Sequence, residues 1–593
     1  MKLPSIKQSE DRYDSFSNKE VLLGKKKQHL PAMGWNSWNA FGSNNTEKLT
    51  KIMADKIVEL GLDKLGYKYV VLDDGCYEPN RVEGRLSNNS VKFPNGFKNL
   101  AQYIHEKGLK FGMYNDIGTK LCSGAEVGTC GFEEIDTQDY VNWGVDFIKV
   151  DNCYYPWDNA TFSDPDNAKY VFAPNIRGIK ITKDNYNIEL SAVKNAVLTG
   201  TIGYIDRDDD CIKGIGTYDG TAPIHCPLDV RSSEIIFEVE VDEDGIYQLY
   251  VNYATDKVEG TGSWLQVKTS ASDSLSYDDF LPETKDAKSF IWSDQIDINL
   301  KAGKNKIRLM NHRRQENTLQ SYKIFLQGLN KANPDHDIIF SICEWGKTQP
   351  QNWGYKVGDS WRILNDITFN VGDDGNNGQA KWIDDYTTSI CSQYNKAVIM
   401  DEFSGLDRGW NDPDMLVIGM DGITDTMART HMALWCMMNS PLMLGLDLRR
   451  VNKDDDIYKI IANKNLIALN QDPLGIQAKR VFSSIEKEHP DATYIRDINR
   501  VDILAKPLYD NSIALCFVNL CQDTDDNEYK IDINDILAKI GHKMVDAEGF
   551  MNAKAYEVTD LWTNETKVIN EELIKVSHLE GCAHVIYKIN PMS

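Results

Sequence analysis

The first part of the chain alternates short apolar runs with longer segments in which apolar residues recur every three or four positions. From residue 30 onward, each run of strand length is followed by such an amphipathic segment. Strands and helices in this order form parallel βα units, because parallel neighbours need a crossover connection. The expected strands are residues 32–38, 67–74, 110–116 and 147–151, and the expected helices are residues 46–62, 97–109 and 137–145.

The rhythm changes after the fourth strand. Between about residues 158 and 320 apolar positions alternate with polar ones, which is the period of a half-buried strand. These runs are joined by turns rich in Gly and Asp, and strands at this spacing are typical of a β-sandwich. The clearest examples are residues 234–241, 246–254, 296–300 and 305–311.

The α/β rhythm then resumes and brings the expected strands to eight, which predicts a closed (β/α)8 barrel, the TIM-barrel architecture. The later strands are expected at residues 338–345, 360–366, 414–419 and 441–448, and the later helices at residues 321–332, near 381–394, 424–438 and 454–469. The sandwich separates the fourth strand from its helix, so it occupies a loop on the face where barrel active sites lie.

The fold class is therefore α/β, a barrel with an inserted β-sandwich and a C-terminal antiparallel β-domain. Runs such as residues 511–520 and 582–589 indicate that last domain. The expected parts are an N-terminal extension (1–29), the catalytic barrel (30–157 and 321–475), the inserted sandwich (158–320) and a C-terminal β-sandwich (476–593).

Composition narrows the class of partner. The formal net charge of −24 would repel nucleic acids and anionic membranes, so a neutral small-molecule or oligosaccharide substrate fits better. The sequence is compatible with a homo-oligomer. Twelve cysteines without a C-x-x-C pair or His/Cys ligand spacing argue against zinc and iron–sulfur sites, and we expect no metal and no cofactor.

The charged N-terminal residues and the longest apolar run both bear on where the protein is located. The first residues carry charges where an export signal would be apolar, and the longest apolar run, residues 432–446, is interrupted by polar residues and proline. We therefore expect no membrane span and predict a cytoplasmic protein, or a secreted one if a signal precedes this sequence in the natural chain.

Polar side chains collect where the predicted strands end. Asp151, after the fourth strand, could by itself be only a helix cap or a turn residue. The other strand ends, however, carry further polar residues, and these ends share one rim in a barrel, so capping does not explain the set. The set comprises Trp38, Asp73, Asp74, Tyr114, Asp116, Lys149, Asp151, Glu344, Arg362, Asp366, Asp412 and Asp414.

Clustered carboxylates with aromatic residues indicate glycoside hydrolysis. In that reaction one carboxylate attacks the sugar or activates water, and another protonates the leaving oxygen. A magnesium site is the competing interpretation, because hard cations also bind carboxylates. The tryptophans favour a sugar, whose C–H faces pack on aromatic rings, and the Gly-rich loops or basic clusters of a phosphate-handling metal site are absent from the sequence.

Seven motifs, in this order along the chain, resemble those of the α-galactosidases of glycoside hydrolase family 27. They are MGWNSWNAF, VLDDG, KFGMYND, KVDNC, CEWG, SWRILND and GWNDPDMLVIG. The resemblance covers roughly residues 30–157 and 321–475 and a family-like C-terminal domain, whereas the inserted module resembles a carbohydrate-binding β-sandwich. The family resemblance implies a retaining hydrolase that removes terminal α-galactose by double displacement.

The motifs also imply roles for the catalytic pair. Asp151 corresponds to the nucleophile and Asp366 to the acid/base. The positive charge of Lys149 is expected to lower the pKa of Asp151 and keep it ionised. Asp366 must stay protonated until it donates, which burial and nearby negative charge favour and Arg362 opposes.

The other motif residues are expected to hold the sugar. By resemblance, Trp38 stacks on the ring, Asp73 and Asp74 bind the 4- and 6-hydroxyls, Lys149 the 3- and 4-hydroxyls, Arg362 and Asp414 the 2-hydroxyl, Tyr114 lies beside the nucleophile, and Glu344 and Trp345 lie on the 2-position side. Cys122 and Cys153 correspond to a pair that is bridged in many family members, and here they are either a disulfide or two thiols beside the sugar.

Three alternatives stay open at this point. A β-L-arabinopyranosidase acts on a sugar without the hydroxymethyl group, and two short aspartates at positions 73 and 74 leave room for that group. An α-N-acetylgalactosaminidase must admit a 2-acetamido group, which a charged Glu344 and a bulky Trp345 disfavour. A lectin-like protein would have lost a catalytic aspartate, and both are present. The sequence therefore favours α-galactose.

Overall fold

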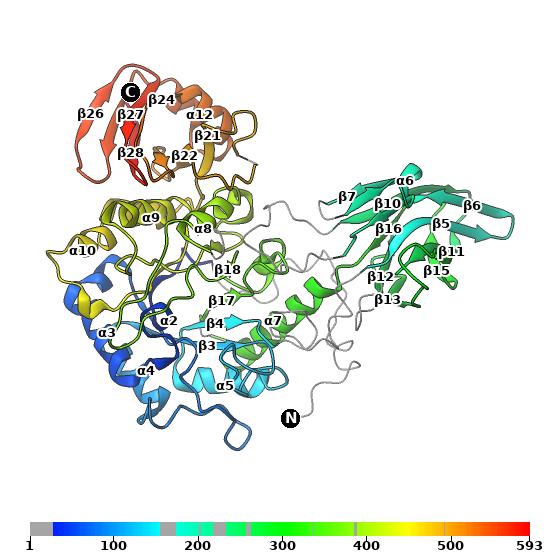
Figure 1. The fold of residues 1–593 in the computed structure, drawn as a ribbon, viewed down its shortest axis with the longest axis horizontal. Coiled ribbons are helices and arrows are strands. Elements are labelled where there is room, and N and C mark those ends of the chain that lie inside the picture. The colour runs from blue at the N-terminus through cyan, green and yellow to red at the C-terminus, as the bar shows by residue number, and fades with distance from the viewer. Residues whose placement is uncertain are drawn as a thin grey trace.

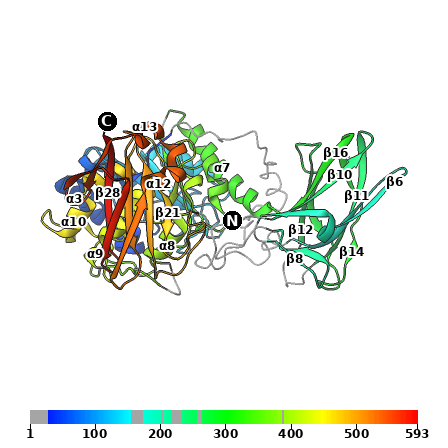
Figure 2. The same cartoon turned by 90° about the horizontal axis from the view of Figure 1, so that it is seen from above.

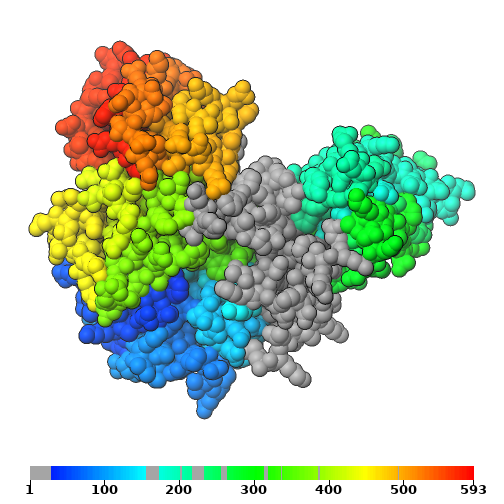
Figure 3. Space-filling view, in the orientation of Figure 1, coloured from blue at the N-terminus to red at the C-terminus, as the bar shows by residue number. Residues whose placement is uncertain are grey.

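The structure is a computed structural model, and it describes residues 28–154, 173–200, 203–216, 233–255, 263–335, 337–384, 388–491 and 493–592, without the side chains of residues 313–317. The predicted N-terminal extension, residues 1–29, lies outside the described residues except for its last two. The barrel, the inserted β-structure and the C-terminal β-structure stand out as separate lobes (Figures 1 and 3).

Eight parallel strands form the sheet of the barrel, in the order β19-β18-β17-β4-β3-β2-β1-β20. Beyond β19 the chain closes the ring, because the Leu416 N–H donates to the Met443 carbonyl (2.8 Å) and the Gly445 N–H donates to the Leu416 carbonyl (3.0 Å). The predicted (β/α)8 barrel is thus confirmed. Its strands are β1 (Met33–Asn36), β2 (Tyr69–Val71), β3 (Lys110–Asp116), β4 (Phe147–Asp151), β17 (Ile339–Cys343), β18 (Ser360–Arg362), β19 (Trp410–Asp412) and β20 (Leu442–Leu444).

Helices cover the outside of the ring, and apolar side chains fill its inside. The helix ends follow local sequence: the Thr46 hydroxyl accepts from the Leu49 N–H at the start of α3, and Gly61 ends it in the left-handed conformation. Inside the ring lies a buried cluster of Tyr69, Val71, Phe147, Ile339, Met415 and Met443. The outer helices are α3 (Glu47–Leu60), α4 (Gly96–His105), α5 (Glu133–Trp143), α7 (Arg313–Ala332), α8 (Ile390–Ala397), α9 (Asp425–Met437), α10 (Asp456–Ile461) and α11 (Lys464–Asn470).

Two expected elements differ from the structure. The seventh strand, predicted at residues 414–419, lies earlier, at Trp410–Asp412. Pro413 cannot donate to a ladder and Asp414 has a φ of +74°, so the strand ends before them, and of the apolar residues that follow Leu416 bridges to β20 instead. The last predicted helix, residues 454–469, is two helices, because the Asn463 side chain accepts from backbone N–H groups and starts α11 anew.

The inserted segment folds as two facing β-sheets with their own buried core. One sheet has the order β13-β12-β16-β10-β7 and the other β14-β11-β5-β9-β8, with β15 and β6 beside it. The expected strands near 296–300 and 305–311 are present, but they lie in different sheets, since β15 pairs with β11 and β16 with β10 and β12. The strands are β5 (Asn175–Lys183), β6 (Tyr186–Ser191), β7 (Ala196–Thr199), β8 (Tyr204–Asp206), β9 (Cys211–Lys213), β10 (Glu234–Val241), β11 (Gly245–Ala254), β12 (Ser263–Thr269), β13 (Tyr277–Leu281), β14 (Ile291–Trp292), β15 (Ile296–Leu300) and β16 (Gly303–Met310).

The sandwich joins the barrel through α7. Strand β16 ends at Met310 and α7 begins at Arg313, and the helix runs from the sandwich to the barrel (Figures 1 and 2). Trp264, on β12, is buried and belongs to the same apolar cluster as the barrel core. On the barrel, the Tyr322 hydroxyl of α7 donates to the Val150 carbonyl (2.9 Å), directly before Asp151. The insert therefore continues directly into the helix that bonds to the end of β4.

The C-terminal part is antiparallel, as expected. A six-stranded sheet, β21-β22-β23-β28-β25-β26, and a two-stranded sheet, β24-β27, enclose a third apolar core. It rests on the barrel near α8 and α9 (Figure 1), where the Tyr394 hydroxyl donates to Asp502 Oδ2 (2.9 Å). The strands are β21 (Lys479–Ser483), β22 (Val501–Pro507), β23 (Ile513–Asn519), β24 (Asp525–Asp532), β25 (Ala555–Asp560), β26 (Thr566–Ile569), β27 (Leu573–Leu579) and β28 (His584–Met592). Across the described part of the chain, no helix has the length and apolar character needed to cross a bilayer.

Candidate active site

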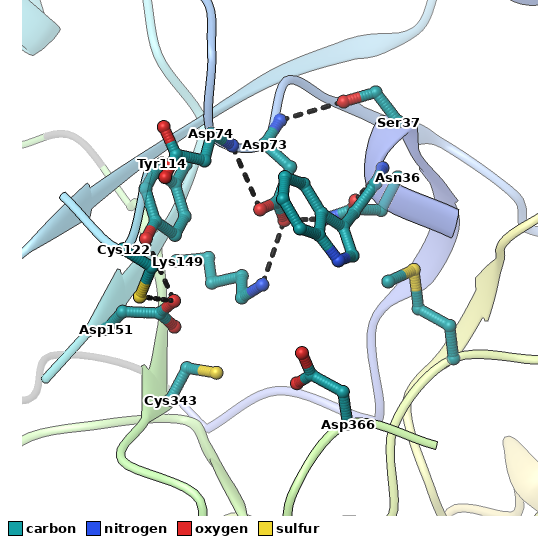
Figure 4. A network of polar contacts seen from close by, with 12 residues as sticks. Asn36, Ser37, Asp73, Asp74, Tyr114, Cys122, Lys149, Asp151, Cys343 and Asp366 are labelled. Carbon is teal, nitrogen blue, oxygen red and sulfur yellow. Dashed lines mark hydrogen bonds and ion pairs between the residues drawn. The ribbon is translucent and has the colours of Figure 1, made fainter. Parts of the chain in front are cut away.

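The polar residues predicted at the strand ends meet at one rim of the barrel. Register brings Asp116, Asp151 and Cys343 side by side at the ends of β3, β4 and β17. Figure 4 shows Asp151 and Asp366 on two sides of one space, with the side chains of Lys149 and Cys343 directed into it. Segments far apart in the sequence thus build one site.

Asp151 is 5% exposed and is held through one oxygen. The Tyr114 hydroxyl donates to Oδ2 (2.9 Å), and Cys122 Sγ lies 3.3 Å from the same atom. Within the described residues, Oδ1 is buried and makes no hydrogen bond of good geometry. Burial raises the pKa of Asp151 to about 7, against opposing contributions from Lys149 and from the Cys343 thiol. The expected effect of Lys149 has the predicted sign, but burial is larger.

Lys149 forms its ion pair with the loop that follows β2, since Nζ lies 2.9 Å from Asp73 Oδ2. Burial by itself would lower the pKa of Lys149, but the charges of Asp73 and Asp151 raise it well above its usual value, so the ammonium persists. Asp73 also accepts from Asn36 Nδ2 (2.8 Å). Its carboxylate is therefore fixed before any ligand arrives.

Asp74 is fixed by a loop instead. The Ser123 N–H donates to Asp74 Oδ2 (2.8 Å) and the Ser123 hydroxyl donates to Oδ1 (2.9 Å). Burial raises the pKa of Asp74, and both bonds from Ser123 act against that rise. The loop that carries Ser123 is also the loop of Cys122, which is bonded to Cys153. The disulfide, one of the two expected states, is thus confirmed.

Asp366 follows β18, and its side chain is 24% exposed. Arg362 Nη2 donates to its Oδ1 (3.1 Å), and the Thr388 hydroxyl donates to its carbonyl. Burial raises the pKa of Asp366, Arg362 opposes the rise, and the negative charge of Asp414 adds to it. Burial and Asp414 therefore raise the pKa of Asp366 and Arg362 lowers it, as expected from the sequence.

Arg362 also pairs with Asp414, whose Oδ2 lies 2.9 Å from Nη2. That oxygen accepts from the N–H of Ile367 as well (2.7 Å). Burial raises the pKa of the neighbouring Asp412 to about 6. Arg362 and Asp414 are thus brought together with Asp366 at one corner of the site.

The other predicted residues line the rim in different ways. Trp38 is half-buried and packs on the apolar cluster inside the barrel. Trp345, with a φ of +55°, packs beside Cys153 and Cys343. Glu344 is fully buried, and its Oε2 accepts from both the N–H (2.6 Å) and the hydroxyl (2.7 Å) of Thr348. The Glu344 carboxylate therefore stabilises the turn after β17 through its two hydrogen bonds with Thr348.

Sequence reasoning missed three residues of this site: Asn36, Ser123 and Cys343. Cys343 accepts a long contact from Arg362 Nη1 (3.7 Å) and lies beside Asp151. Asn36 and Cys343 lie within quoted motifs at strand ends, and Ser123 directly follows Cys122, so these positions were the available signal.

One cluster resembles a metal site. Asp116, Cys122, Asp151 and Cys153 bring four ligand-type atoms within 4.8 Å of one another. In the disulfide the two sulfurs are not thiolates, and both Asp116 oxygens already accept, from the N–H groups of Gly118 (2.6 Å) and Cys153 (2.7 Å). The donor set therefore does not fit a metal in the disulfide form.

Comparison with known proteins gives consistent matches. The family described as "Alpha galactosidase A" matches residues 30–180 and 280–472, and "Alpha galactosidase C-terminal beta sandwich domain" matches residues 499–589. An "Alpha-galactosidase A" of Cellvibrio japonicus is 26% identical over 92% of this chain and 89% of its own. An "Alpha-galactosidase" of Cyamopsis tetragonoloba is 26% identical over 82% of this chain and 72% of its own.

A solved structure shares the fold. The α-galactosidase of Saccharomyces cerevisiae, determined with raffinose, aligns with a TM-score of 0.58 over 97% of this chain and 99% of its own, at 19% identity. The fold of this chain is therefore shared with an experimentally determined structure.

Proposed function

We propose that this chain, which belongs to glycoside hydrolase family 27 and is therefore a glycoside hydrolase, removes terminal α-D-galactosyl residues from oligosaccharides or glycoconjugates with retention of configuration. The observation that carries the proposal is the pair of carboxylates, Asp151 and Asp366, that face one space from different strands (Figure 4). Their surroundings differ: Asp151 receives a hydroxyl and lies near a cation, and Asp366 is bonded to a guanidinium shared with Asp414. Two carboxylates in different environments suit two roles.

In the first step Asp151 attacks the anomeric carbon and forms a glycosyl-enzyme, while Asp366 transfers its proton to the leaving oxygen. Asp151 needs to be ionised, and the Tyr114 hydroxyl bond and the Lys149 charge both favour that form. In the second step Asp366, now a carboxylate, takes a proton from water, which attacks the same carbon from the opposite side to Asp151. Two inversions give net retention.

The sugar is galactose in this proposal. Asp73 and Asp74 present two short, pre-oriented carboxylates for hydroxyl groups, and Trp38 presents a half-buried ring for the C–H face. Arabinopyranose, without the hydroxymethyl group, would be a weak side substrate. Trp345, packed against the disulfide, leaves no flexible side chain to move aside for a 2-acetamido group. Raffinose, found with the yeast relative, is a natural first oligosaccharide to test.

One set of assays tests the proposal. We expect kcat/KM to fall in the order nitrophenyl α-galactoside, β-L-arabinopyranoside, α-N-acetylgalactosaminide, with the last near background. NMR should show the α-anomer of galactose as the first product. A β-anomer would overturn retention, and a preference for the arabinoside would overturn the sugar assignment. Asp151→Asn should lose turnover while keeping the fold.

We propose a second, supporting function for the inserted sandwich, namely binding of the glycan chain. On the outer face of one sheet the Lys180 ammonium lies 4.5 Å from the ring centre of Tyr250 and 5.2 Å from that of Trp292. Asn252 pairs with Trp292 across β11 and β14, so its side chain shares this face. Rings with hydrogen-bonding groups between them suit a neutral sugar chain.

This second function has its own test. Trp292→Ala in the full chain should weaken retention on a galactomannan matrix and raise KM for that polymer, without changing kinetics on nitrophenyl galactoside. Tyr204→Ala is the matched control, because Tyr204 is 56% exposed on β8, at the other edge of the same sheet. Equal behaviour of the two variants on the polymer would overturn the binding role.

A further inference from the structure

Asp414 adopts a backbone conformation that a non-glycine residue rarely takes, with a φ of +74°. Five contacts hold it there. Its N–H donates to Asp412 Oδ1 (2.8 Å), its Oδ1 accepts from the Met415 N–H (2.7 Å), and its carbonyl accepts from Trp435 Nε1 (2.8 Å). Strained residues held from several sides are a feature of functional sites.

The other two contacts go to the acid/base corner. Asp414 Oδ2 accepts from the N–H of Ile367, the residue after Asp366, and from Arg362 Nη2. The same guanidinium nitrogen donates to Asp366 Oδ1. One oxygen of Asp414 therefore fixes the backbone beside Asp366. The same oxygen competes with the Asp366 carboxylate for the Arg362 guanidinium.

We propose that Trp435 is a positioning residue for Asp366: its indole N–H holds Asp414 in the left-handed conformation, and Asp414 in turn holds Ile367 and Arg362. The proposal rests on the proposed function, in which Asp366 is the acid/base. It adds a residue on α9 that makes no contact with the sugar. It also gives Asp414 a structural role, holding Ile367 and Arg362, in addition to the expected contact with the 2-hydroxyl.

Trp435 suits this positioning role because its side chain is buried and tightly packed. The side chain is fully buried, and the His431 ring packs edge-on against it with centres 4.0 Å apart. His431 stays neutral, since burial lowers its pKa to about 3, and its Nε2 accepts from the Val417 N–H (3.1 Å) on the same loop. Trp435 and His431 thus fix both ends of the segment from Asp414 to Val417.

Loss of the Trp435 bond has a definite electrostatic consequence. The charged groups that face Asp366 are Arg362 on β18, Lys149 and Asp151 on β4, and Asp414 after β19. Asp412, the last residue of β19, interacts with Arg362 and Asp414. When Asp414 shifts away, its negative charge recedes and Arg362 pairs fully with Asp366. Both changes lower the pKa of Asp366, so less of the acid form is present at neutral pH.

The experiment compares Trp435→Phe with Trp410→Phe. Both tryptophans are buried and both donate one indole hydrogen bond, but Trp410 donates to the His29 carbonyl (2.9 Å), away from the site. For Trp435→Phe we expect kcat on raffinose, which needs acid assistance, to fall about tenfold or more. On dinitrophenyl α-galactoside, whose leaving group needs little assistance, kcat/KM should change less than twofold, because kcat/KM reports only the steps up to formation of the glycosyl-enzyme. The alkaline limb of the raffinose profile should move to lower pH.

The outcomes separate the possible readings. If Trp435→Phe and Trp410→Phe lose the same activity on both substrates, Trp435 is only structural and the proposal is overturned. A rise in KM that is absent with the 2-deoxygalactoside, together with equal losses on raffinose and dinitrophenyl galactoside, would mean that Asp414 acts on the 2-hydroxyl alone, which also overturns it. Should Trp435→Phe not fold, Asp414→Asn must show the same leaving-group split. If Asp366→Asn retains activity on raffinose, the acid/base assignment itself fails, irrespective of Trp435.

Discussion

Lys149 Nζ lies 2.9 Å from Asp73 Oδ2, so the lysine that precedes Asp151 by two residues is paired with a carboxylate in the loop after another strand, β2 (Figure 4). The two charges of this pair act in opposite directions on the pKa of Asp151. Asp73 raises the pKa of Asp151 while Lys149 lowers it, and burial remains as the dominant effect. The nucleophile of the proposed mechanism is therefore a carboxylate that the free protein holds near its titration point at neutral pH.

The raised pKa of Asp151 predicts a stability cost at the active site. Its pKa is about 7 in the folded protein and about 4 in an unfolded chain. Between these values the folded state binds the extra proton, so the free energy of unfolding falls as pH rises through this window, and the loss is complete above pH 7. Asp151→Asn removes that titration.

We therefore expect Asp151→Asn to be more stable than the parent at pH 8 and equally stable near pH 4. A shift of about three units corresponds to roughly 4 kcal/mol at most. Thermal unfolding midpoints at pH 4, 6 and 8 measure the difference. Asp454→Asn, at an exposed carboxylate, is the control and should give no pH-dependent gain. A constant difference at all three pH values would contradict the burial argument.

The positive charge of Lys149 leads to a second prediction. Because its charge lowers the pKa of Asp151, Lys149→Met should raise that pKa. The acid limb of kcat/KM on nitrophenyl galactoside should then move to higher pH by roughly one unit, a typical effect of one nearby charge. Lys120→Met removes an exposed lysine paired with Glu126 and should leave the limb in place. An acid limb that stays fixed in Lys149→Met would mean that Asp151 does not govern it.

The disulfide leads to a third prediction. Cys122 and Cys153 are 31 residues apart, and closing a loop of this size stabilises a protein by about 2–4 kcal/mol. The double variant Cys122→Ser, Cys153→Ser should unfold at lower temperature and lose kcat, because Cys122 lies against Asp151 and its loop holds Asp74. Cys391→Ser, at a buried thiol on α8, is the control for loss of a cysteine. Equal kcat in the parent and the double variant would show that the loop keeps its place without the bond.

The barrel could be predicted from the sequence because alternating strand and helix periods leave few topologies, and the rim could be predicted because strand ends converge. The seventh strand was misplaced because residues 415–418 are as apolar as a strand, whereas the backbone of Asp414 decides their path. Contacts such as Lys149 with Asp73 join residues 76 apart in the chain, and no local pattern encodes such a pairing. The net pKa shift of Asp151 depends on burial, which a motif does not measure.

Ser123 gives the last prediction, which tests the sugar through a residue that sequence reasoning missed. Its hydroxyl and its N–H both donate to Asp74, so Ser123→Ala removes one of two bonds that orient this carboxylate and keep its pKa down. If Asp74 binds the hydroxymethyl oxygen of galactose, the variant should raise KM for nitrophenyl α-galactoside several-fold at nearly constant kcat. The β-L-arabinopyranoside has no such oxygen, and its KM should not change, so the preference for galactose should shrink. Ser90→Ala is the matched control, because Ser90 also donates both its N–H and its hydroxyl to one carboxylate, that of Glu78, on the surface. Equal KM increases for both sugars would place Asp74 at a hydroxyl that galactose and arabinose share.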